Sequence, residues 1–206
     1  MPLTTYAELQ ASIADFLNRD DLTNVIKDFI SLTEADMDRK LRHWRMEKRA
    51  TVSLDDQYSR VPSDWLESIR FYLSEGNTFE LRQTSHADII NRRMNAANTS
   101  GRPQFYTMSD GAFEIFPTPD TAYTAELLYY GRTAALSDSN TSNWVLEYAP
   151  DAYLYGALMH SAPYLVDDAR TQVWASLYQT AIDNVNMASE KARTSTSGMR
   201  MNIRSY

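Results

Sequence analysis

The sequence predicts an α+β fold: a helical bundle formed by the N- and C-terminal helices, with an inserted antiparallel β region. Apolar residues recur at helical spacing near both ends, whereas they alternate with polar residues in the middle of the chain. A hydrophobic content of 43% over 206 residues is sufficient for a core. We therefore expect a discontinuous bundle over residues 1–50 and 134–192, a β region with a short helix over 51–133, and a flexible tail over 193–206.

The N-terminal segment predicts two helices joined by a short linker. Thr5 and Glu8 have the spacing of a capping box at the start of YAELQASIADFL. Arg19-Asp20-Asp21 ends this first helix, and a second amphipathic helix follows it. The apolar face of the second helix comprises Val25, Ile26, Phe29, Ile30, Met37 and Leu41.

The middle of the chain predicts strands, hairpin turns and one helix. The segments read as strands are TVSL (51–54), FEL (79–81), FEIF (113–116) and 122–130. Asp110-Gly111 is a two-residue hairpin signal, because glycine accepts the positive φ that the favoured turns require. Residues 74–77 form a second expected turn, and 86–97 form the helix between the hairpins.

Helical spacing returns after the polar stretch 137–143, where we expect Ser142 or Asn143 to cap a helix. Pro150 suits a first helical turn, where its missing N–H costs nothing, and Pro163 is expected to end or kink the helix. Asp167-Asp168 should begin a last long helix. Its apolar stripe comprises Val173, Trp174, Leu177, Tyr178, Ala181, Ile182 and Val185.

Four aromatic residues follow the polar stretch closely: Trp144, Tyr148, Tyr153 and Tyr155. The segment around them is apolar on nearly every side, which predicts burial. Two interpretations stay open. The four rings either fill the core of one molecule, or also form a seam between subunits.

The residues that usually carry catalysis or metal binding are sparse. The chain has no cysteine, its three histidines are far apart, and it lacks a glycine-rich phosphate loop. Asp138-Ser-Asn140 begins like a calcium loop, but Ala149 stands where a bidentate glutamate is needed. We therefore expect no catalytic residue, no metal and no cofactor, although a pair of carboxylates acting as a glycan hydrolase stays as an alternative.

The net charge of −7 conceals two basic segments, residues 39–49 and 191–206. The first could be a nucleic-acid-binding module, a helix C-terminus, or a contact with an acidic patch on a neighbouring subunit. We favour the helix C-terminus, because the rest of the chain is acidic and would repel phosphate. The candidate residues for a subunit or acidic-partner contact are Arg42, Trp44, Arg45 and Lys48, together with Tyr148 and Tyr155.

The second basic segment combines charge with apolar anchors that alternate with basic or polar residues, as an added strand requires. We expect this tail to become ordered on a partner protein, with plain disorder as the alternative. The proposed docking residues are Arg193, Met199, Arg200, Met201, Ile203, Arg204 and Tyr206.

Several segments in their order resemble the head-to-tail adaptor proteins of tailed bacteriophages, including the tail tubular protein A type. They are YAELQASIADFLNRDDL, VPSDWLESIRF, GRPQFY, FPTPD, LLYYGR, the stretch 137–158 and SAPYLVDDARTQVWASLYQTA. The likeness spans roughly residues 5 to 185. No one of these segments is diagnostic alone.

The resemblance implies a structural virion protein of the neck, made in the bacterial cytoplasm, and not an enzyme. Such proteins form a ring, commonly of twelve copies, that binds beneath the capsid portal and contacts the tail nozzle or tube. Phage DNA passes through the channel without specific binding, and no membrane is involved. The partners implied are therefore further copies of the chain, the portal protein and a tail protein. The resemblance also implies that the C-terminal tail docks on the portal or on a neighbouring subunit.

Overall fold

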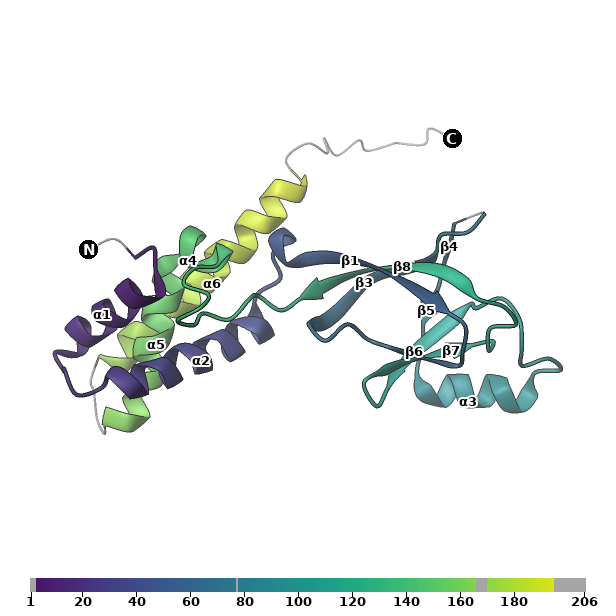
Figure 1. The fold of residues 1–206 in the computed structure, drawn as a ribbon, viewed down its shortest axis with the longest axis horizontal. Coiled ribbons are helices and arrows are strands. Elements are labelled where there is room, and N and C mark those ends of the chain that lie inside the picture. The colour runs from purple at the N-terminus through teal and green to yellow at the C-terminus, as the bar shows by residue number, and fades with distance from the viewer. Residues whose placement is uncertain (1–2, 77, 166–169, 195–206) are drawn as a thin grey trace, which may run out of the picture. The chain divides into compact units, whose positions relative to one another are not determined.

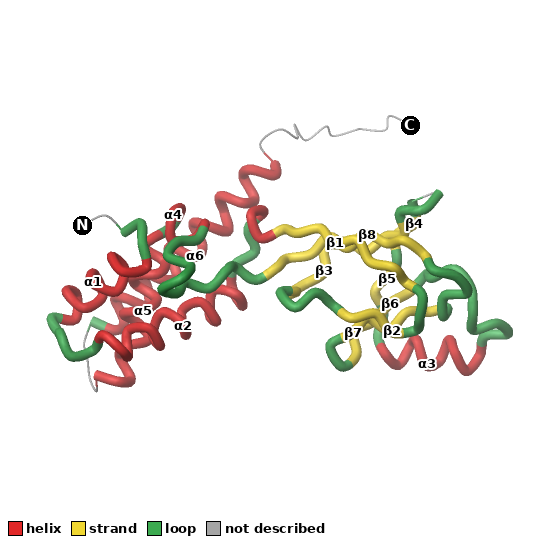
Figure 2. The backbone as a smooth tube through the Cα atoms, in the orientation of Figure 1, coloured by secondary structure: helices red, strands yellow, loops and turns green. Residues whose placement is uncertain are grey.

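The computed structural model describes residues 3–76, 78–165 and 170–194. It confirms an α+β protein, with six α-helices and two mainly antiparallel sheets among these residues (Figure 1). The chain divides into two compact units. The helical unit contains the described residues up to Arg45 and from Thr133 onward, and the β unit runs from Met46 to Arg132. Figure 2 shows the helices and strands of the two units.

The helical unit contains five helices from the two ends of the chain (Figure 1). They are α1 (Tyr6–Leu17), α2 (Thr23–Lys40), α4 (Trp144–Tyr148), α5 (Pro150–Leu165) and α6 (Thr171–Thr194). Helix α5 contacts each of the other four. Its buried residues are Ala152, Tyr153, Leu154, Gly156, Ala157, Leu158 and Ser161, which confirms the burial predicted for this segment.

Local signals place the ends of these helices. The Thr5 hydroxyl accepts from the Glu8 N–H at 3.3 Å and the Glu8 carboxylate accepts from the Thr5 N–H at 3.0 Å, which confirms the capping box. Asn18 ends α1 in the left-handed region with φ 51°. Pro150 is the first residue of α5, and Pro163 lies near the end of that helix. The expected start of the last helix at Asp167-Asp168 lies outside the described residues.

Gly156 lies where α2, α5 and α6 come closest together. A Cβ atom at this position would lie 2.4 Å from Cγ2 of Thr33 on α2 and 3.0 Å from Cε2 of Tyr178 on α6. Thr33 and Tyr178 are both buried, so neither side chain can move into solvent. Only a residue without a Cβ atom fits this crossing without displacing a neighbour.

The polar stretch 137–143 and the residues before it are held against the helices by hydrogen bonds. Glu34 of α2 accepts from the backbone N–H of Leu136 at 2.7 Å and from the Tyr153 hydroxyl at 3.0 Å. The backbone N–H of Tyr6 donates to the carbonyl of Thr141 at 2.7 Å. Burial raises the pKa of Glu34, because the hydrogen bonds from Leu136 and Tyr153 do not fully offset the loss of water around the carboxylate.

The neighbouring helices cover only part of the apolar stripe on α6. Val173 and Leu177 belong to the stripe, but they are 58% and 39% exposed. Trp174, Tyr178 and the three apolar residues that follow them on the stripe do face the core. The apolar stripe is therefore wider than the surface that α5 and the neighbouring helices cover.

The β unit contains two four-stranded sheets. The first has the order β1 (Glu47–Leu54), β8 (Tyr123–Gly131), β3 (Trp65–Leu73), β4 (Phe79–Glu80), and all its pairs are antiparallel. The second has the order β2 (Tyr58–Arg60), β7 (Ala112–Phe116), β6 (Phe105–Ser109), β5 (Arg82–Gln83), with a parallel pair between β5 and β6. Helix α3 (His86–Asn95) packs on β6.

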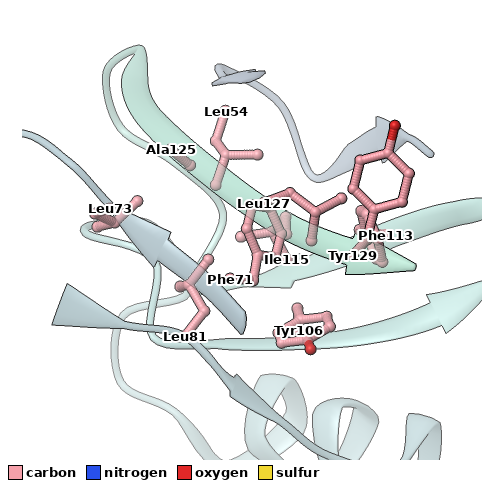
Figure 3. Close-up of a cluster of buried hydrophobic side chains, with 10 residues drawn as sticks. All are labelled: Leu54, Phe71, Leu73, Leu81, Tyr106, Phe113, Ile115, Ala125, Leu127 and Tyr129. Atoms are coloured by element: carbon pink, nitrogen blue, oxygen red, sulfur yellow. The ribbon is translucent and has the colours of Figure 1, made fainter. Parts of the chain in front are cut away.

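The core of the β unit is built from the facing sides of both sheets, and Figure 3 shows its ten buried side chains. Phe71 of β3 packs against Tyr106 of β6 and Phe113 of β7, with ring centroids 5.3 and 5.2 Å apart. The remaining members are Leu54, Leu73, Leu81, Ile115, Ala125, Leu127 and Tyr129. The two sheets therefore share one apolar layer, as in a small sandwich.

The predicted turns are present, but the first strand is longer than predicted. Asp110 and Gly111 have φ values of 49° and 70° and join β6 to β7, which confirms the hairpin. Gly76 has φ 66° and lies between the paired strands β3 and β4. Strand β1 begins at Glu47, four residues before the expected Thr51, because its pairing with β8 starts at Glu47 opposite Tyr130.

We expect Gly156→Ala to destabilise the protein. The overpacking cost of about 1–3 kcal/mol exceeds the gain of up to about 1 kcal/mol that alanine brings to a helix interior. Urea denaturation of the two proteins measures the difference.

The double variant Gly156→Ala with Thr33→Ser is the matched control. It removes the methyl group nearest to the new Cβ and keeps the hydroxyl that donates to the Phe29 carbonyl. We expect it to recover stability relative to Gly156→Ala alone. A single variant as stable as the wild type would show that the crossing tolerates a side chain.

Candidate interaction site on the helical unit

Aromatic rings from two distant segments meet beside the end of α2. We call His43, Trp44, Trp144 and Tyr148, with the guanidinium of Arg45, the aromatic cluster. His43 lies at its centre and is 2% exposed, whereas Trp44 and Tyr148 are 46% and 47% exposed. The cluster thus has a buried interior and an accessible outer surface.

Residues 41–45 follow α2 and contain His43, Trp44 and Arg45, and we call them the connector. Helix α6 holds this connector in place. The side-chain oxygen of Asn186 accepts from the backbone N–H of Arg42 at 3.0 Å, and its amide donates to the carbonyl of Lys40 at 3.1 Å. Three residues later, the hydroxyl of Ser189 accepts from the backbone N–H of Trp44 at 3.0 Å. Because residues three apart share a helix face, one side of α6 holds the whole connector after α2.

Asn143 positions the second half of the cluster by capping α4. Its side-chain oxygen accepts from the backbone N–H groups of Val145 and Leu146 at 3.1 and 3.0 Å, which confirms the predicted cap. Its amide donates to the carbonyl of Ala134 at 2.8 Å and to the Tyr153 hydroxyl at 2.7 Å. The same side chain therefore starts α4 and ties it to α5.

The rings make close and specific contacts. His43 stacks on Trp144 with centroids 4.9 Å apart and an angle of 23° between the rings. It also lies 5.4 Å from Trp44 and 5.7 Å from Tyr148. The Arg45 guanidinium lies 5.4 Å from the Trp44 ring and 5.3 Å from the Tyr148 ring, within cation–π range of both.

The electrostatics of the cluster favour neutral His43. Burial lowers its pKa, and the positive charges of Arg45 and Arg193 lower it further. The neutral ring accepts from the backbone N–H of Arg45 at Nδ1, over 3.2 Å. The exposed cation of the cluster is thus Arg45, and the histidine is part of the packing.

A shallow groove adjoins the cluster on the side of Tyr148. It has a volume of about 310 Å³ and is lined by Tyr148, Ala149, Asp151, Ala181, Asn184 and Val185. Its walls come from α4, the start of α5 and one face of α6. An exposed aromatic pair beside a groove is a surface suited to protein contacts.

The structure brings together three of the residues predicted for a subunit contact: Trp44, Arg45 and Tyr148. Arg42 lies next to them in the chain, but its guanidinium donates to the carbonyls of Asp38 and Leu41 at the end of α2. Helix α2 ends at Lys40 with Arg39 and Lys40 in its last turn, so the interpretation as a helix C-terminus is confirmed for the start of the basic segment.

The other predicted site residues lie elsewhere. Lys48 belongs to β1, where it forms an ion pair with Asp64, and Tyr155 lies half-buried on α5. Arg193 is the exception: it is in the last turn of α6, close enough to His43 for its charge to lower the pKa of that side chain. The remaining docking residues of the tail, Met199, Arg200, Met201, Ile203, Arg204 and Tyr206, lie outside the described residues.

The sequence does not distinguish His43 from an ordinary histidine, and it does not single out Asn186 or Ser189. The only sequence signal for the latter two is their spacing, since they continue the stripe of Ile182 and Val185 along α6. Their hydrogen-bond partners Arg42 and Trp44 lie 144 and 145 positions away in the chain. A single sequence contains no pattern that links them.

The described residues give no sign of a metal site or a membrane span. No group of three or more His, Asp or Glu side chains within residues 3–76, 78–165 and 170–194 is arranged so that it could hold a metal ion. None of the helices that the structure describes is both long and apolar enough to cross a bilayer.

Comparison with known proteins identifies a family. A family model described as SU10 adaptor protein matches residues 4–203, which is nearly the whole chain. No curated protein matches the sequence.

We expect His43 to make stability pH-dependent. Its pKa is lowered in the folded protein, so the unfolded chain binds the proton more readily, and stability is lost as pH falls below the usual histidine value. The free energy of unfolding should therefore fall more steeply between about pH 7.5 and about pH 5 in the wild type than in His43→Phe. Denaturant titrations across this range measure both slopes.

His160 serves as an internal control for this comparison. Burial lowers its pKa as well, and it is present in both proteins, so its contribution cancels in the difference. Parallel pH profiles for the wild type and His43→Phe would show that His43 does not titrate as its surroundings indicate.

Proposed function

The chain belongs to the SU10 adaptor protein family, and we propose that it forms the head-to-tail adaptor ring of a tailed bacteriophage. Membership of this family identifies a structural adaptor of the phage virion. In our proposal, the ring joins the capsid portal to the tail nozzle or tube, as in adaptors of the tail tubular protein A type. Twelve copies surround a channel through which phage DNA leaves the capsid.

The observation that carries this proposal is the exposed surface of the aromatic cluster. Trp44 and Tyr148 present nearly half of their surface to solvent, with the Arg45 guanidinium within cation–π range of both rings. Tryptophan, tyrosine and arginine are the residues most enriched among those that dominate binding energy at protein interfaces. Because the buried side of the cluster is fixed by α4 and α6, these side chains are ordered before a partner arrives, which lowers the entropy cost of association.

Further apolar side chains are exposed on the same unit. They come from α1, α2, α5 and α6, and comprise Phe16, Leu32, Tyr164, Val173, Leu177 and Met187. Scattered apolar residues are normal on a monomer, but six from four helices together with an aromatic cluster indicate surfaces that further protein copies cover. A ring subunit has two neighbours and two axial partners, so it needs several such surfaces.

The charge of the protein suits a DNA channel. The net charge of −7 repels phosphate, so the wall of a channel built from many copies does not hold the DNA that passes through it. Among the described residues, the bases at the start of β1 are also already neutralised, since Lys48 pairs with Asp64 and Arg49 with Glu126. These pairs weaken the alternative of a nucleic-acid-binding module at residues 39–49.

A mass measurement of the chain with and without the portal protein of its phage tests this function. We expect a complex that contains one portal ring and about twelve copies of this chain, in keeping with closed cyclic symmetry. A chain that stays monomeric and never joins the portal would refute the adaptor proposal.

We expect the double variant Trp44→Ala with Tyr148→Ala to fold and to lose assembly. Truncating interface residues of this kind costs about 2 kcal/mol or more each, which corresponds to a loss of affinity of well over tenfold. Mass photometry of variant and portal mixtures measures the loss, and circular dichroism checks the fold. The matched control is Met94→Ala, which removes an apolar side chain on α3 that is 77% exposed. Equal assembly by the double variant and the control would exclude the aromatic cluster from the interface.

A further inference from the structure

The groove beside Tyr148 has a floor of small apolar side chains. Ala149 follows α4, and Ala181 and Val185 share one face of α6 because they are four residues apart. All three are buried. Two of them are alanines, so their side chains leave a space of about 310 Å³ between α4, the start of α5 and α6. A narrow aliphatic chain from another molecule can pack on this floor.

The rim of the groove carries three polar side chains that form no hydrogen bond with the described residues. They are the phenol of Tyr148, the carboxylate of Asp151 at the start of α5, and the amide of Asn184 on α6. All three side chains are exposed. A ligand in the groove therefore replaces only water at these groups, and Asp151 and Asn184 can each accept a hydrogen bond from it.

The charge around the groove is negative. The two segments that form it, residues 143–156 and 176–190, contain four acidic side chains and no base. Of these acids, Asp151 lines the groove, and it forms no ion pair with a described residue. A cation in the groove is thus attracted by a carboxylate that the described part of the chain leaves unpaired.

The bases near the aromatic cluster do not line the groove. Arg45 lies 5.3 Å from the Tyr148 ring, and the charges of Arg45 and Arg193 lower the pKa of His43, but neither arginine belongs to the lining. Because Arg45 already lies within cation–π range of the Tyr148 ring, the attraction for a further cation comes from Asp151. The ring of Tyr148 serves that cation as a wall of the groove.

We propose that the groove accepts an arginine side chain of the portal protein. The aliphatic stem of that arginine packs on the floor, and its guanidinium reaches the rim. There it pairs with the Asp151 carboxylate and donates to the side-chain oxygen of Asn184. This inference rests on the proposed adaptor function, because that function supplies the portal.

Two features select this occupant. Arginine fits the rim better than lysine, because its planar guanidinium donates in two directions at once and is more weakly hydrated than an ammonium group. The portal is the source because Tyr148 belongs both to the groove and to the aromatic cluster, whose exposed rings we expect to bind the portal. An arginine that docks beside Tyr148 also places together residue types that dominate binding energy at protein interfaces.

Removal of the Asp151 charge tests the proposal. Asp151→Asn keeps the size of the side chain, and Asp183→Asn is the matched control, because Asp183 is an exposed carboxylate of α6 that does not line the groove. We expect Asp151→Asn to weaken binding of the full-length chain to the portal at least about tenfold, because a charged hydrogen-bonded pair is lost. The control should stay within about twofold of the wild type. Biolayer interferometry at fixed salt measures both, and equal affinities of the two variants would overturn the proposal.

Photo-cross-linking identifies the occupant of the groove. The variant Thr180→p-benzoylphenylalanine carries the reactive group at an exposed position of α6, four residues before Asn184. The complex with the portal is illuminated, and mass spectrometry identifies the linked peptide. We expect a portal peptide that contains an arginine. A peptide from a second copy of this chain, a portal peptide without arginine, or the absence of any linked peptide would contradict the proposed occupant.

A double-mutant cycle joins the two measurements. The linked arginine of the portal is changed to alanine, and this portal variant is tested against the wild-type chain and against Asp151→Asn. If the two groups pair, both changes together weaken binding several-fold less than the product of the single effects. Independent effects would show that Asp151 does not pair with that arginine.

The same binding data separate this inference from the adaptor function. A wild-type chain that binds the portal with an affinity that Asp151→Asn leaves unchanged would refute the arginine site and leave the adaptor function standing. A wild-type chain that never binds the portal would refute the adaptor function, and the arginine site with it.

Discussion

The helical unit depends on the crossing of three helices at Gly156. Thr33 of α2 and Tyr178 of α6 approach this residue so closely that a Cβ atom cannot be accommodated without movement. Helices α2 and α6 come from opposite ends of the chain, and α5 brings them together. Tight packing at this one position therefore turns the two terminal segments into a single body.

The proposed interaction site follows from that packing. Once α6 is fixed against α2 and α5, Asn186 and Ser189 are placed to hold the connector after α2, and Asn143 orients α4 beside it. His43 then packs between the two segments, and its ring contacts the rings of Trp44 and Tyr148. Both exposed rings therefore contact a side chain that is itself buried. This division, with fixed interior contacts and a free outer surface, is what a subunit needs when it folds first and assembles later.

Features with local causes could be predicted from the sequence, and features with long-range causes could not. The capping box at Thr5, the turn at Asp110-Gly111 and the cap at Asn143 each depend on residues within four positions, and all three are present. The exposure of Val173 and the contacts of Ser189 depend on which helices lie nearby, and periodicity does not contain that information. For the same reason Tyr148 could be proposed as a contact residue, but not as a neighbour of Trp44 and Arg45.

The first and last strands of the β unit, β1 and β8, pair with each other, and Glu47 lies opposite Tyr130. Its two ends are thus side by side, as in a cassette with a single point of attachment. Evolution can lengthen, shorten or replace such a cassette without rebuilding the bundle that carries it. The β unit and the helical unit can in this way diverge at different rates, each under the constraints of its own surface.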